Sequence, residues 1–588
     1  MDPVLSDSRK SPMAHSLPFQ PSFQGFCPVA EAVERLASDG GTGERGAVYT
    51  KREVVDFMLD LVGYTDDQPL TSFRLLEPAF GAGDFIFPAV KRLLSAAQHE
   101  ADGLSLERLA PAIRGVELHR ATFACNRKAM HAMMIEQGMG VSDTEALLDI
   151  WLSQGDFLLS GFDQDFTHVV GNPPYVRQEA IPDVLMKEYR QRYNTIYDRA
   201  DIYVPFIEQS LRLLGVEGKL SFICTDRWIK NRYGKKLREL VSSTYHHLTT
   251  YVDMVGTDAF HTEVSTYPAI IVIERCVPGQ TSKVTRVFSR PKINIKVLSG
   301  LARELKAPKL HPSSTIREIS KIAAGGEPWI TENLDALALV RRLEAEFPRL
   351  EEAGCKVGIG VATGADKAFI SDFDALDVEP SRKLPLVMTR DILQGYVQWR
   401  GKGVINPFTD DGKLVSLEDF PKLRRYLNER HGQIARRHIA TKVPQNWYRT
   451  IDRIYPELAR REKLLIPDIK GKVSIVYEEG RLYPHHNLYF ITSDKWDVHA
   501  LQAIMQSGIA RLFISLYSTR MRGGYLRFQA QYLRRIRLPR WESLSDSVRE
   551  RLKHYSETND QQELNEIVMS LYGLSSDEMT LVEGERVK

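Results

Sequence analysis

The sequence contains few cysteines and no long hydrophobic run. Its five cysteines are spread over 588 residues without a Cys-x-x-Cys pair, which argues against a disulfide framework and a cysteine-based zinc site. We expect no bound metal, and we interpret four histidines as structural, namely His246, His247, His485 and His486. No apolar run has the length of a membrane span, and the N-terminal stretch is too rich in proline, serine and charge for a signal peptide. These absences predict a cytoplasmic protein with no membrane partner.

The overall composition is that of a globular protein with room for several domains. Hydrophobic residues make up 43% of the chain and charged residues 26%. The net charge of +2 excludes little, because a polyanionic partner responds to how charge is distributed along the chain.

That distribution is uneven in the C-terminal half. Between Arg511 and Arg540 there are eight arginines and no acidic residue, and aromatic residues are interleaved with them, among them Tyr517, Tyr525, Phe528 and Tyr532. The stretch from Lys422 to Lys442 adds seven basic residues against one acidic residue. Such stretches bind phosphates readily, so a nucleic-acid partner is predicted. A solvated basic helix is the alternative for the 422–442 stretch.

The most informative motif is Asn172-Pro173-Pro174-Tyr175, which follows a short apolar strand over 167–171. Each proline fixes its own φ and keeps the preceding residue out of the α region, so the backbone here is extended and rigid. The Asn172 side-chain oxygen and the Pro173 carbonyl can then accept hydrogen bonds from one substrate NH2 group. The Tyr175 ring offers a flat face to a planar base. The motif therefore predicts alkylation of an amino nitrogen, and a proline-containing turn is the alternative.

A glycine-bearing loop earlier in the chain predicts a nucleotide-type binding site. It runs from Glu77 at the end of a strand through Ala79 to Gly81 and Gly83, and a helix follows. The glycines let the backbone approach a ligand where a Cβ would collide. The loop lacks the third glycine of a dinucleotide fingerprint, so alone it also fits a simple chain reversal.

Two further loops add acidic residues at the expected places. Glu117 ends a second strand, the position from which a ribose diol is bound in doubly wound folds. Asp156 and Phe157 precede the 167–171 strand, where an acid can accept from an adenine amino group and a ring can pack on the base. Each acid alone is more simply a solvated loop residue, but three such loops in order are hard to produce by chance.

The remaining elements predict a Rossmann-like α/β fold. Thr50 and Glu53 have capping-box spacing before an amphipathic helix, which either covers an edge of the next domain or binds a ligand at its N-terminus. The segments 249–255 and 268–274 read as strands too close together for a parallel crossover, so an antiparallel pair is expected. Phe260 lies in their connection, where it could approach Tyr175, and a core aromatic is the alternative.

These motifs, in this order, resemble the DNA adenine-N6 methyltransferases of restriction-modification systems, in the subgroup whose target-recognition region follows the catalytic domain. The resemblance implies a class I S-adenosylmethionine-dependent fold with a mostly parallel, seven-stranded sheet and one antiparallel strand, plus a C-terminal mixed α/β DNA-recognition domain. Lys51 stands where many members have proline. The segment 358–369 is similar to the one that opens the recognition region in relatives.

The resemblance also assigns roles to residues of this chain. It implies that S-adenosylmethionine is bound by Thr50, Glu77, Ala79, Gly81, Gly83, Glu117, Asp156 and Phe157. It implies that catalysis rests on Asn172, Pro173, Pro174 and Tyr175, with Tyr175 and Phe260 stacking on a flipped-out adenine of double-stranded DNA. In the basic C-terminal stretch we expect DNA contacts from Arg520, Arg522, Arg527, Arg534 and Arg535.

We expect five regions along the chain. They are an N-terminal arm with a short helix (1–45), a catalytic domain (46–290), a linker (291–320), a target-recognition domain (321–545) and an acidic helical tail (546–588). A separately encoded restriction nuclease, or proteins of a defence system, is a possible partner.

Three alternatives remain open at this point. The same motif can serve methylation of an RNA base or of a protein glutamine, against which the basic C-terminal region argues. A non-catalytic DNA-specificity subunit is a second alternative, which the intact cofactor loops oppose. A fused nuclease is a third, although only some 45 residues precede the expected catalytic domain.

Overall fold

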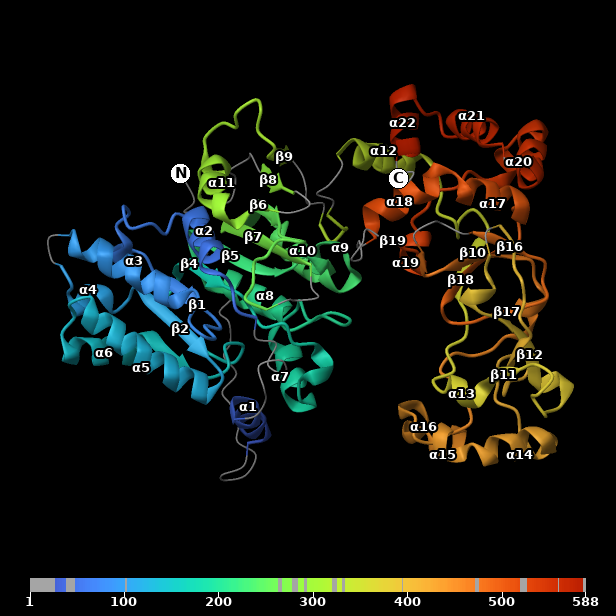
Figure 1. Ribbon diagram of the computed structural model, residues 1–588, viewed down its shortest axis with the longest axis horizontal. Coiled ribbons are helices and arrows are strands. Elements are labelled where there is room, and N and C mark those ends of the chain that lie inside the picture. Colours follow the sequence, from blue (N-terminus) through green and yellow to red (C-terminus); the bar gives the residue numbers. More distant parts are fainter. Residues whose placement is uncertain are drawn as a thin grey trace, which may run out of the picture. The chain divides into compact units, whose positions relative to one another are not determined.

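The computed structural model describes residues 27–38, 48–100, 103–262, 267–277, 284–289, 293–319, 325–329, 334–393, 395–470, 475–518, 526–558 and 560–584. The chain divides into two compact units, Met1–Trp329 and Ile330–Lys588 (Figure 1). The expected linker, 291–320, therefore belongs to the first unit. No helix in the described ranges is long and apolar enough to cross a membrane.

The first unit is built on a nine-stranded sheet in the order β3-β2-β1-β4-β5-β7-β6-β8-β9. The strands are β1 (Leu75–Glu77), β2 (Ile113–Glu117), β3 (Leu152–Gln154), β4 (Phe166–Gly171), β5 (Leu214–Thr225), β6 (His246–Asp253), β7 (Pro268–Arg275), β8 (Thr285–Phe288) and β9 (Arg317–Ile319). The first five in this order pair in parallel, and β7 runs antiparallel to both β5 and β6. The class I methyltransferase fold predicted above is confirmed in these seven strands.

The sheet extends two strands beyond the expected seven. β8 pairs in parallel with β6, and β9 pairs antiparallel with β8. Both are only three or four residues long, too short for an alternating pattern to reveal them in the sequence.

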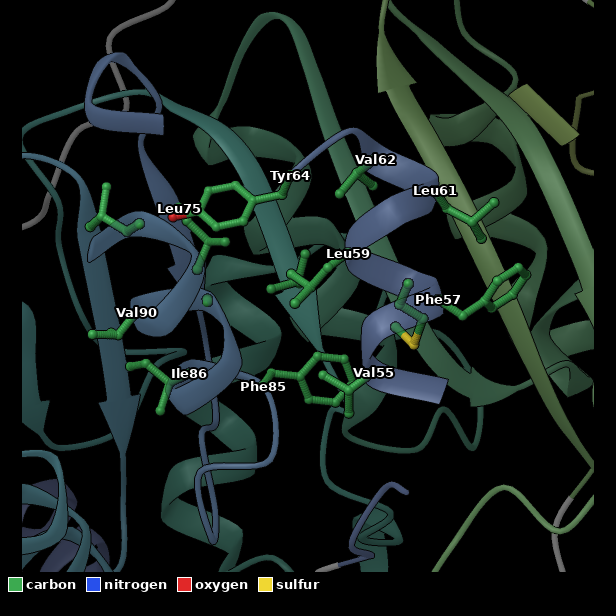
Figure 2. Packing of buried hydrophobic residues seen from close by; sticks show 14 of the residues in the cluster. Val55, Phe57, Leu59, Leu61, Val62, Tyr64, Leu75, Phe85, Ile86 and Val90 are labelled. Atoms are coloured by element: carbon green, nitrogen blue, oxygen red, sulfur yellow. The ribbon is translucent and has the colours of Figure 1, made fainter. Parts of the chain in front are cut away.

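Helices lie on and around this sheet (Figure 1). They are α1 (Pro28–Ser38), α2 (Arg52–Val62), α3 (Ile86–Gln98), α4 (Leu106–Leu109), α5 (Arg120–Glu136), α6 (Val141–Trp151), α7 (Asp183–Arg192), α8 (Tyr203–Leu213), α9 (Arg227–Lys230), α10 (Lys235–Val241) and α11 (Leu298–Lys306). Figure 2 shows Val55 and Leu59 of α2 pointing toward Phe85 and Leu75, whereas Phe57 points from the other side of the helix. These side chains are buried, so α2 has apolar neighbours on more than one side.

The predicted capping box at the start of α2 is wrong. The helix begins at Arg52, and its N-cap is Lys51, which makes no side-chain capping hydrogen bond. Thr50 instead pairs with Phe260 in an isolated antiparallel bridge, and its backbone N–H donates to Asp84 Oδ2 at 2.7 Å. These contacts with Phe260 and Asp84 hold Thr50 outside the helix.

The second unit contains two four-stranded sheets and a short ribbon. Their orders are β10-β18-β14-β16, β11-β13-β12-β17 and β15-β19. The strands are β10 (Cys355–Ile359), β11 (Ile370–Asp372), β12 (Lys383–Val387), β13 (Lys402–Ile405), β14 (Lys463–Pro467), β15 (Ile469–Lys470), β16 (Val476–Glu478), β17 (Tyr483–Pro484), β18 (Leu488–Ser493) and β19 (Leu526–Arg527). This mixed α/β unit corresponds to the expected recognition region.

The helices of this unit pack on more than one core. They are α12 (Leu334–Glu346), α13 (Asp366–Phe369), α14 (Pro421–Glu429), α15 (His431–Ile434), α16 (His438–Lys442), α17 (Val498–Gln506), α18 (Gly508–Tyr517), α19 (Ala530–Leu533), α20 (Asp546–Thr558), α21 (Gln561–Leu571) and α22 (Ser576–Gly584). Helices α13 to α15 contribute to a smaller core, and α12 and α17 to α22 contribute to the larger one. Tyr517, Phe528 and Tyr532, which the sequence places among the arginines, are buried in this core. They pack the unit together and are not displayed to a ligand.

Candidate active site

A cavity of about 500 Å³ lies at the carboxyl ends of β1, β2 and β4 in the first unit. This is where doubly wound folds bind their ligands. Its lining includes eight residues singled out from the sequence: Glu77, Ala79, Gly81, Glu117, Asp156, Phe157, Asn172 and Pro174. Five others are not among the described lining residues: Thr50, Gly83, Pro173, Tyr175 and Phe260.

The glycine loop has the backbone conformation that its residues permit. Gly81 and Gly83 have φ values of +49° and +90°, in the region that L side chains rarely adopt. A Cβ at Gly83 would lie 2.2 Å from the Phe87 ring. Glycine at this position therefore lets the first turn of α3 pack directly against the loop. The Gly81 N–H donates to Glu117 Oε2 at 2.8 Å, and its carbonyl accepts from Asn126 Nδ2 at 2.7 Å. The loop is thus held to the end of β2 and to α5.

Several carboxyl groups surround the cavity. Glu77 is buried, and its Oε2 has no hydrogen-bond partner among the described residues. Burial, with Asp84 and Glu117 nearby, raises the pKa of Glu77 well above its ordinary value. Burial also raises the pKa of Asp84. The site therefore favours a ligand that brings positive charge and hydrogen-bond donors.

Asp156 is tied into the wall of the cavity. Its Oδ1 accepts from the Leu158 N–H at 2.8 Å, and its Oδ2 accepts from the Tyr189 hydroxyl. Burial raises the pKa of Asp156, and the Tyr189 and Leu158 hydrogen bonds oppose that rise. Tyr189 belongs to α7 and also lines the cavity, and no sequence motif points to it.

Asn172 is fixed in one orientation. Its Nδ2 donates to the Val48 carbonyl at 2.8 Å and to Thr50 Oγ1 at 3.2 Å. Its Oδ1 is buried, and no described residue donates to it. Asp84, next to Gly83 in the glycine loop, accepts from the Thr50 backbone N–H. Thr50 therefore contacts both the glycine loop and Asn172. Sequence reasoning missed Asp84 and Val48, although Asp84 directly follows Gly83.

The two aromatic residues expected to stack on a base have other contacts. The Tyr175 hydroxyl donates to the Ile223 carbonyl on β5 at 3.4 Å, and burial raises the pKa of Tyr175. Phe260 is 5% exposed and belongs to the core cluster. Its bridge to Thr50 brings the connection between β6 and β7 next to the support of Asn172. Stacking by Tyr175 and Phe260 stays a prediction.

Known proteins match the chain along nearly its whole length. Type II methyltransferase M.PaeR7I of Pseudomonas aeruginosa is 56% identical, over 97% of this chain and 99% of that protein. Type II methyltransferase M.XhoI of Xanthomonas vasicola is 51% identical, over 92% and 99%. The model of the Eco57I restriction-modification methylase family matches residues 116–260, and that of the TaqI-like C-terminal specificity domain matches residues 413–538. The chain belongs to the Type II restriction-modification methyltransferases.

A solved structure shares the fold of this methyltransferase. It is the Type IIL restriction-modification enzyme MmeI in complex with DNA, with a TM-score of 0.56 and 10% identity. The match covers 91% of this chain and 77% of that one. At this identity the likeness concerns the fold alone.

The predicted DNA-binding arginines of the methyltransferase have varied surroundings. Arg520 and Arg522 lie outside the described residues. The other three form ion pairs within the second unit: Arg527 with Asp468, Arg534 with Glu351 and Arg535 with Glu344. The Arg535 guanidinium also lies 4.0 Å from the Tyr517 ring centroid. These three side chains have partners in the protein, so DNA contact by them stays a prediction.

Proposed function

We propose that this methyltransferase transfers a methyl group from S-adenosylmethionine to the N6 amino group of adenine in double-stranded DNA. The observation that carries the proposal is the buried Asn172 Oδ1, which has no donor among the described residues. A buried acceptor left without a partner costs about 1 to 3 kcal/mol, so a site that keeps one is prepared for a donor from its substrate. An exocyclic amino group is such a donor.

The direction of the Asn172 amide supports an amino substrate. Val48 and Thr50 accept from Nδ2, which leaves Oδ1 as the part of the amide able to receive a proton donor. The proposal adds the Pro173 carbonyl as a second acceptor for the same NH2 group. Hydrogen bonds to both favour a tetrahedral nitrogen and stabilise the positive charge that develops on it during attack.

The residues of the cavity suit S-adenosylmethionine. This cofactor supplies a methyl group on a positively charged sulfur. Burial beside Asp84 and Glu117 raises the pKa of Glu77, and a bound sulfonium would oppose that rise and favour the charged carboxylate. Glu117 would accept from ribose hydroxyls and Asp156 from the adenine amino group, with Phe157 against the adenine ring, all three being lining residues. Gly81 lets the backbone approach the ligand.

Access to Asn172 requires the target base to leave the duplex. The Asn172 oxygen is buried beside the cavity, out of reach of a base stacked within a helix. Tyr175 is two residues beyond Pro173, and we retain it, with Phe260, as the stacking pair in this proposal. A separately encoded nuclease also stays a proposal, supported by the names of relatives that match over almost their entire length and are called methyltransferases.

The test of the proposed reaction is tritiated methyl transfer to DNA, with the product nucleoside identified by mass spectrometry. Asn172→Ala should reduce the rate of methyl transfer about 10²- to 10³-fold, because one preorganised acceptor is lost. Binding of cofactor and of DNA should stay near wild type. Tyr175→Phe should keep most activity and Tyr175→Ala should lose much of it, since the ring and not the hydroxyl is needed.

The same assay separates the alternatives. Methylated cytosine as product, or a fully active Asn172→Ala variant, would overturn the proposal. RNA and protein acceptors are assayed in parallel, and preferential labelling of either would favour that alternative. A chain that does not bind S-adenosylmethionine in calorimetry would be a specificity subunit.

DNA contact in the second unit is proposed at the 422–442 stretch. Arg436 and Lys442 are exposed, and neither has an ion-pair partner in the described ranges. By contrast, Arg424 pairs with Glu418 and Arg425 with Asp377. The residues without acidic partners are the ones available to phosphates.

Salt dependence tests this contact. Neutralising Arg436 and Lys442 together to glutamine should reduce the slope of log K against log salt by about 1.8, since each phosphate contact contributes about 0.9. The matched control neutralises Arg424 and Arg425, which have partners, and should change the slope less. Equal slopes for wild type and the Arg436/Lys442 variant would remove these two residues from the DNA interface.

A further inference from the structure

A cluster of metal-ligand types lies in the second unit, away from the methyl-transfer site. Asp366 begins α13, and His485 with His486 follows β17 and precedes β18. β17 belongs to the sheet β11-β13-β12-β17, and β18 belongs to the sheet β10-β18-β14-β16. The two histidines therefore lie where the chain passes from one sheet to the other.

Backbone hydrogen bonds hold this crossing in place. The His485 N–H donates to the Val387 carbonyl at 3.0 Å, and the His486 N–H donates to the Val361 carbonyl at 3.1 Å. Val361 and His485 also form an isolated parallel bridge. The two imidazoles are thus attached to a well-supported backbone, which a ligand site requires.

The three side chains converge on one point. One nitrogen from each histidine and one carboxylate oxygen of Asp366 all lie within 4.8 Å of one another. His485 Nε2 lies 3.2 Å from Asp366 Oδ2, and the other oxygen of Asp366 accepts from Thr363 Oγ1. Thr363 thereby orients the carboxylate toward His485. The His485 and His486 ring centroids are 4.1 Å apart.

Both histidines retain an unused nitrogen. The Nδ1 atoms of His485 and His486 are buried and have no hydrogen-bond partner among the described residues. His485 is only 3% exposed, so water has little access to hydrogen-bond its ring nitrogens. In His485 the Nε2 atom lies beside Asp366, so its free Nδ1 is not the atom that would bind the same ion. The free Nδ1 of His486 leaves a lone pair available to a metal ion.

We propose that Asp366, His485 and His486 bind one divalent transition-metal ion, with Zn²⁺ as the best fit. Two imidazole nitrogens and a carboxylate oxygen are ordinary zinc ligands. Ligand atoms about 2.0 to 2.1 Å from a tetrahedral ion are roughly 3.3 Å from each other. The 3.2 Å between His485 Nε2 and Asp366 Oδ2 is close to this spacing.

The surroundings of the cluster suit a structural cross-link. The Asp366 side chain is 46% exposed, so an ion can reach the cluster from solvent and keep a water as its fourth ligand. Asp366 is 119 positions from His485 in the sequence. The bound ion would fasten the start of α13 to the crossing between the two sheets of the specificity unit. This role is separate from methyl transfer and does not depend on it.

The test is metal binding by the full chain, stripped with a chelator and dialysed. Zn²⁺ is measured by elemental analysis and competition with a chromogenic chelator, and Co²⁺ by its visible absorption. Wild type should bind one equivalent of either ion. Asp366→Asn and His486→Gln should each lower the affinity at least tenfold, and both replace partly exposed side chains so that folding is preserved, which circular dichroism checks.

A matched control is available on α20. His554 is exposed and pairs with Glu557, so His554→Gln removes a histidine outside the cluster and should bind as wild type does. Zn²⁺ should also raise the thermal midpoint of wild type and of His554→Gln, but not of the cluster variants. Wild-type affinity in both Asp366→Asn and His486→Gln, or less than one tenth of an equivalent bound by wild type, would overturn the proposal.

Discussion

Thr50→Val separates two roles that the sequence and the structure suggest for one residue. The sequence predicts Thr50 as a cofactor ligand, but Thr50 is 2% exposed and is not among the described residues lining the cavity. Its Oγ1 accepts from Asn172 Nδ2 at 3.2 Å. Valine has nearly the same shape without the hydroxyl, so it removes this acceptor and little else.

The expected effect is on the rate and not on cofactor affinity. A neutral hydrogen bond contributes about 0.5 to 1.5 kcal/mol, which corresponds to a loss of about 2- to 13-fold in kcat. The loss stays moderate because the Val48 carbonyl still accepts from Nδ2 at 2.8 Å. Without Thr50 Oγ1 the amide of Asn172 is less firmly held, and its Oδ1 is less often aligned with the substrate amino group.

The assay combines single-turnover methyl transfer with calorimetry of S-adenosylmethionine binding. Thr50→Ser is the control, because it keeps the hydroxyl oxygen and should stay within about twofold of wild type. A Thr50→Val variant with tenfold weaker cofactor binding and an unchanged single-turnover rate would refute the positioning role. It would return Thr50 to the cofactor site.

Two further predictions concern cofactor binding and acid stability. Asp156→Ala should weaken S-adenosylmethionine binding by about 1 to 3 kcal/mol in calorimetry, because a buried acceptor is lost. Asp143→Ala, in the first turn of α6 and not among the lining residues, should not weaken it. Burial lowers the pKa of His168 to about 4 from its ordinary 6.5, although its hydrogen bond to the Val62 carbonyl opposes the shift. Between these two pH values the unfolded chain binds a proton that the folded chain does not, so stability should fall as pH falls through this window, by about 3 kcal/mol in total. His168→Gln should flatten that dependence in urea unfolding measured at successive pH values.

Both predictions can be contradicted by measurement. Wild-type affinity of the Asp156→Ala variant would take that carboxylate out of the cofactor site. An equally steep loss of stability between pH 6.5 and 4 in His168→Gln would assign the acid sensitivity to other groups.

Much of the catalytic site follows from local sequence. The Glu77 and Gly81 loop, Glu117, Asp156 and Asn172 each stand at the end of a strand or in the turn after it, and parallel strands bring such ends to one edge of a sheet. Their order along the chain therefore predicted the seven-stranded part of the fold and eight of the residues that line the cavity. The need for glycine at position 83 also has a local cause. Its φ of +90° and the nearby Phe87 ring leave no room for a side chain.

Tertiary structure decided which partner each polar group has. Thr50 has the spacing of a helix cap, yet it supports Asn172, because the connection around Phe260 draws it into a bridge. Arg527 and Arg534 look like phosphate ligands in a stretch without acids, yet Asp468 and Glu351 reach them from far along the chain.

The same holds for the cluster of Asp366, His485 and His486. These residues have no metal-binding spacing in the sequence, and they meet only where the chain crosses between two sheets. Most strand and loop positions of the first unit depend on neighbours within a few residues, so the sequence by itself determined them, except for the short β8 and β9. Pairing of charges and ligands across 59 to 183 residues depends on how the sheets pack, and only the folded chain decides it.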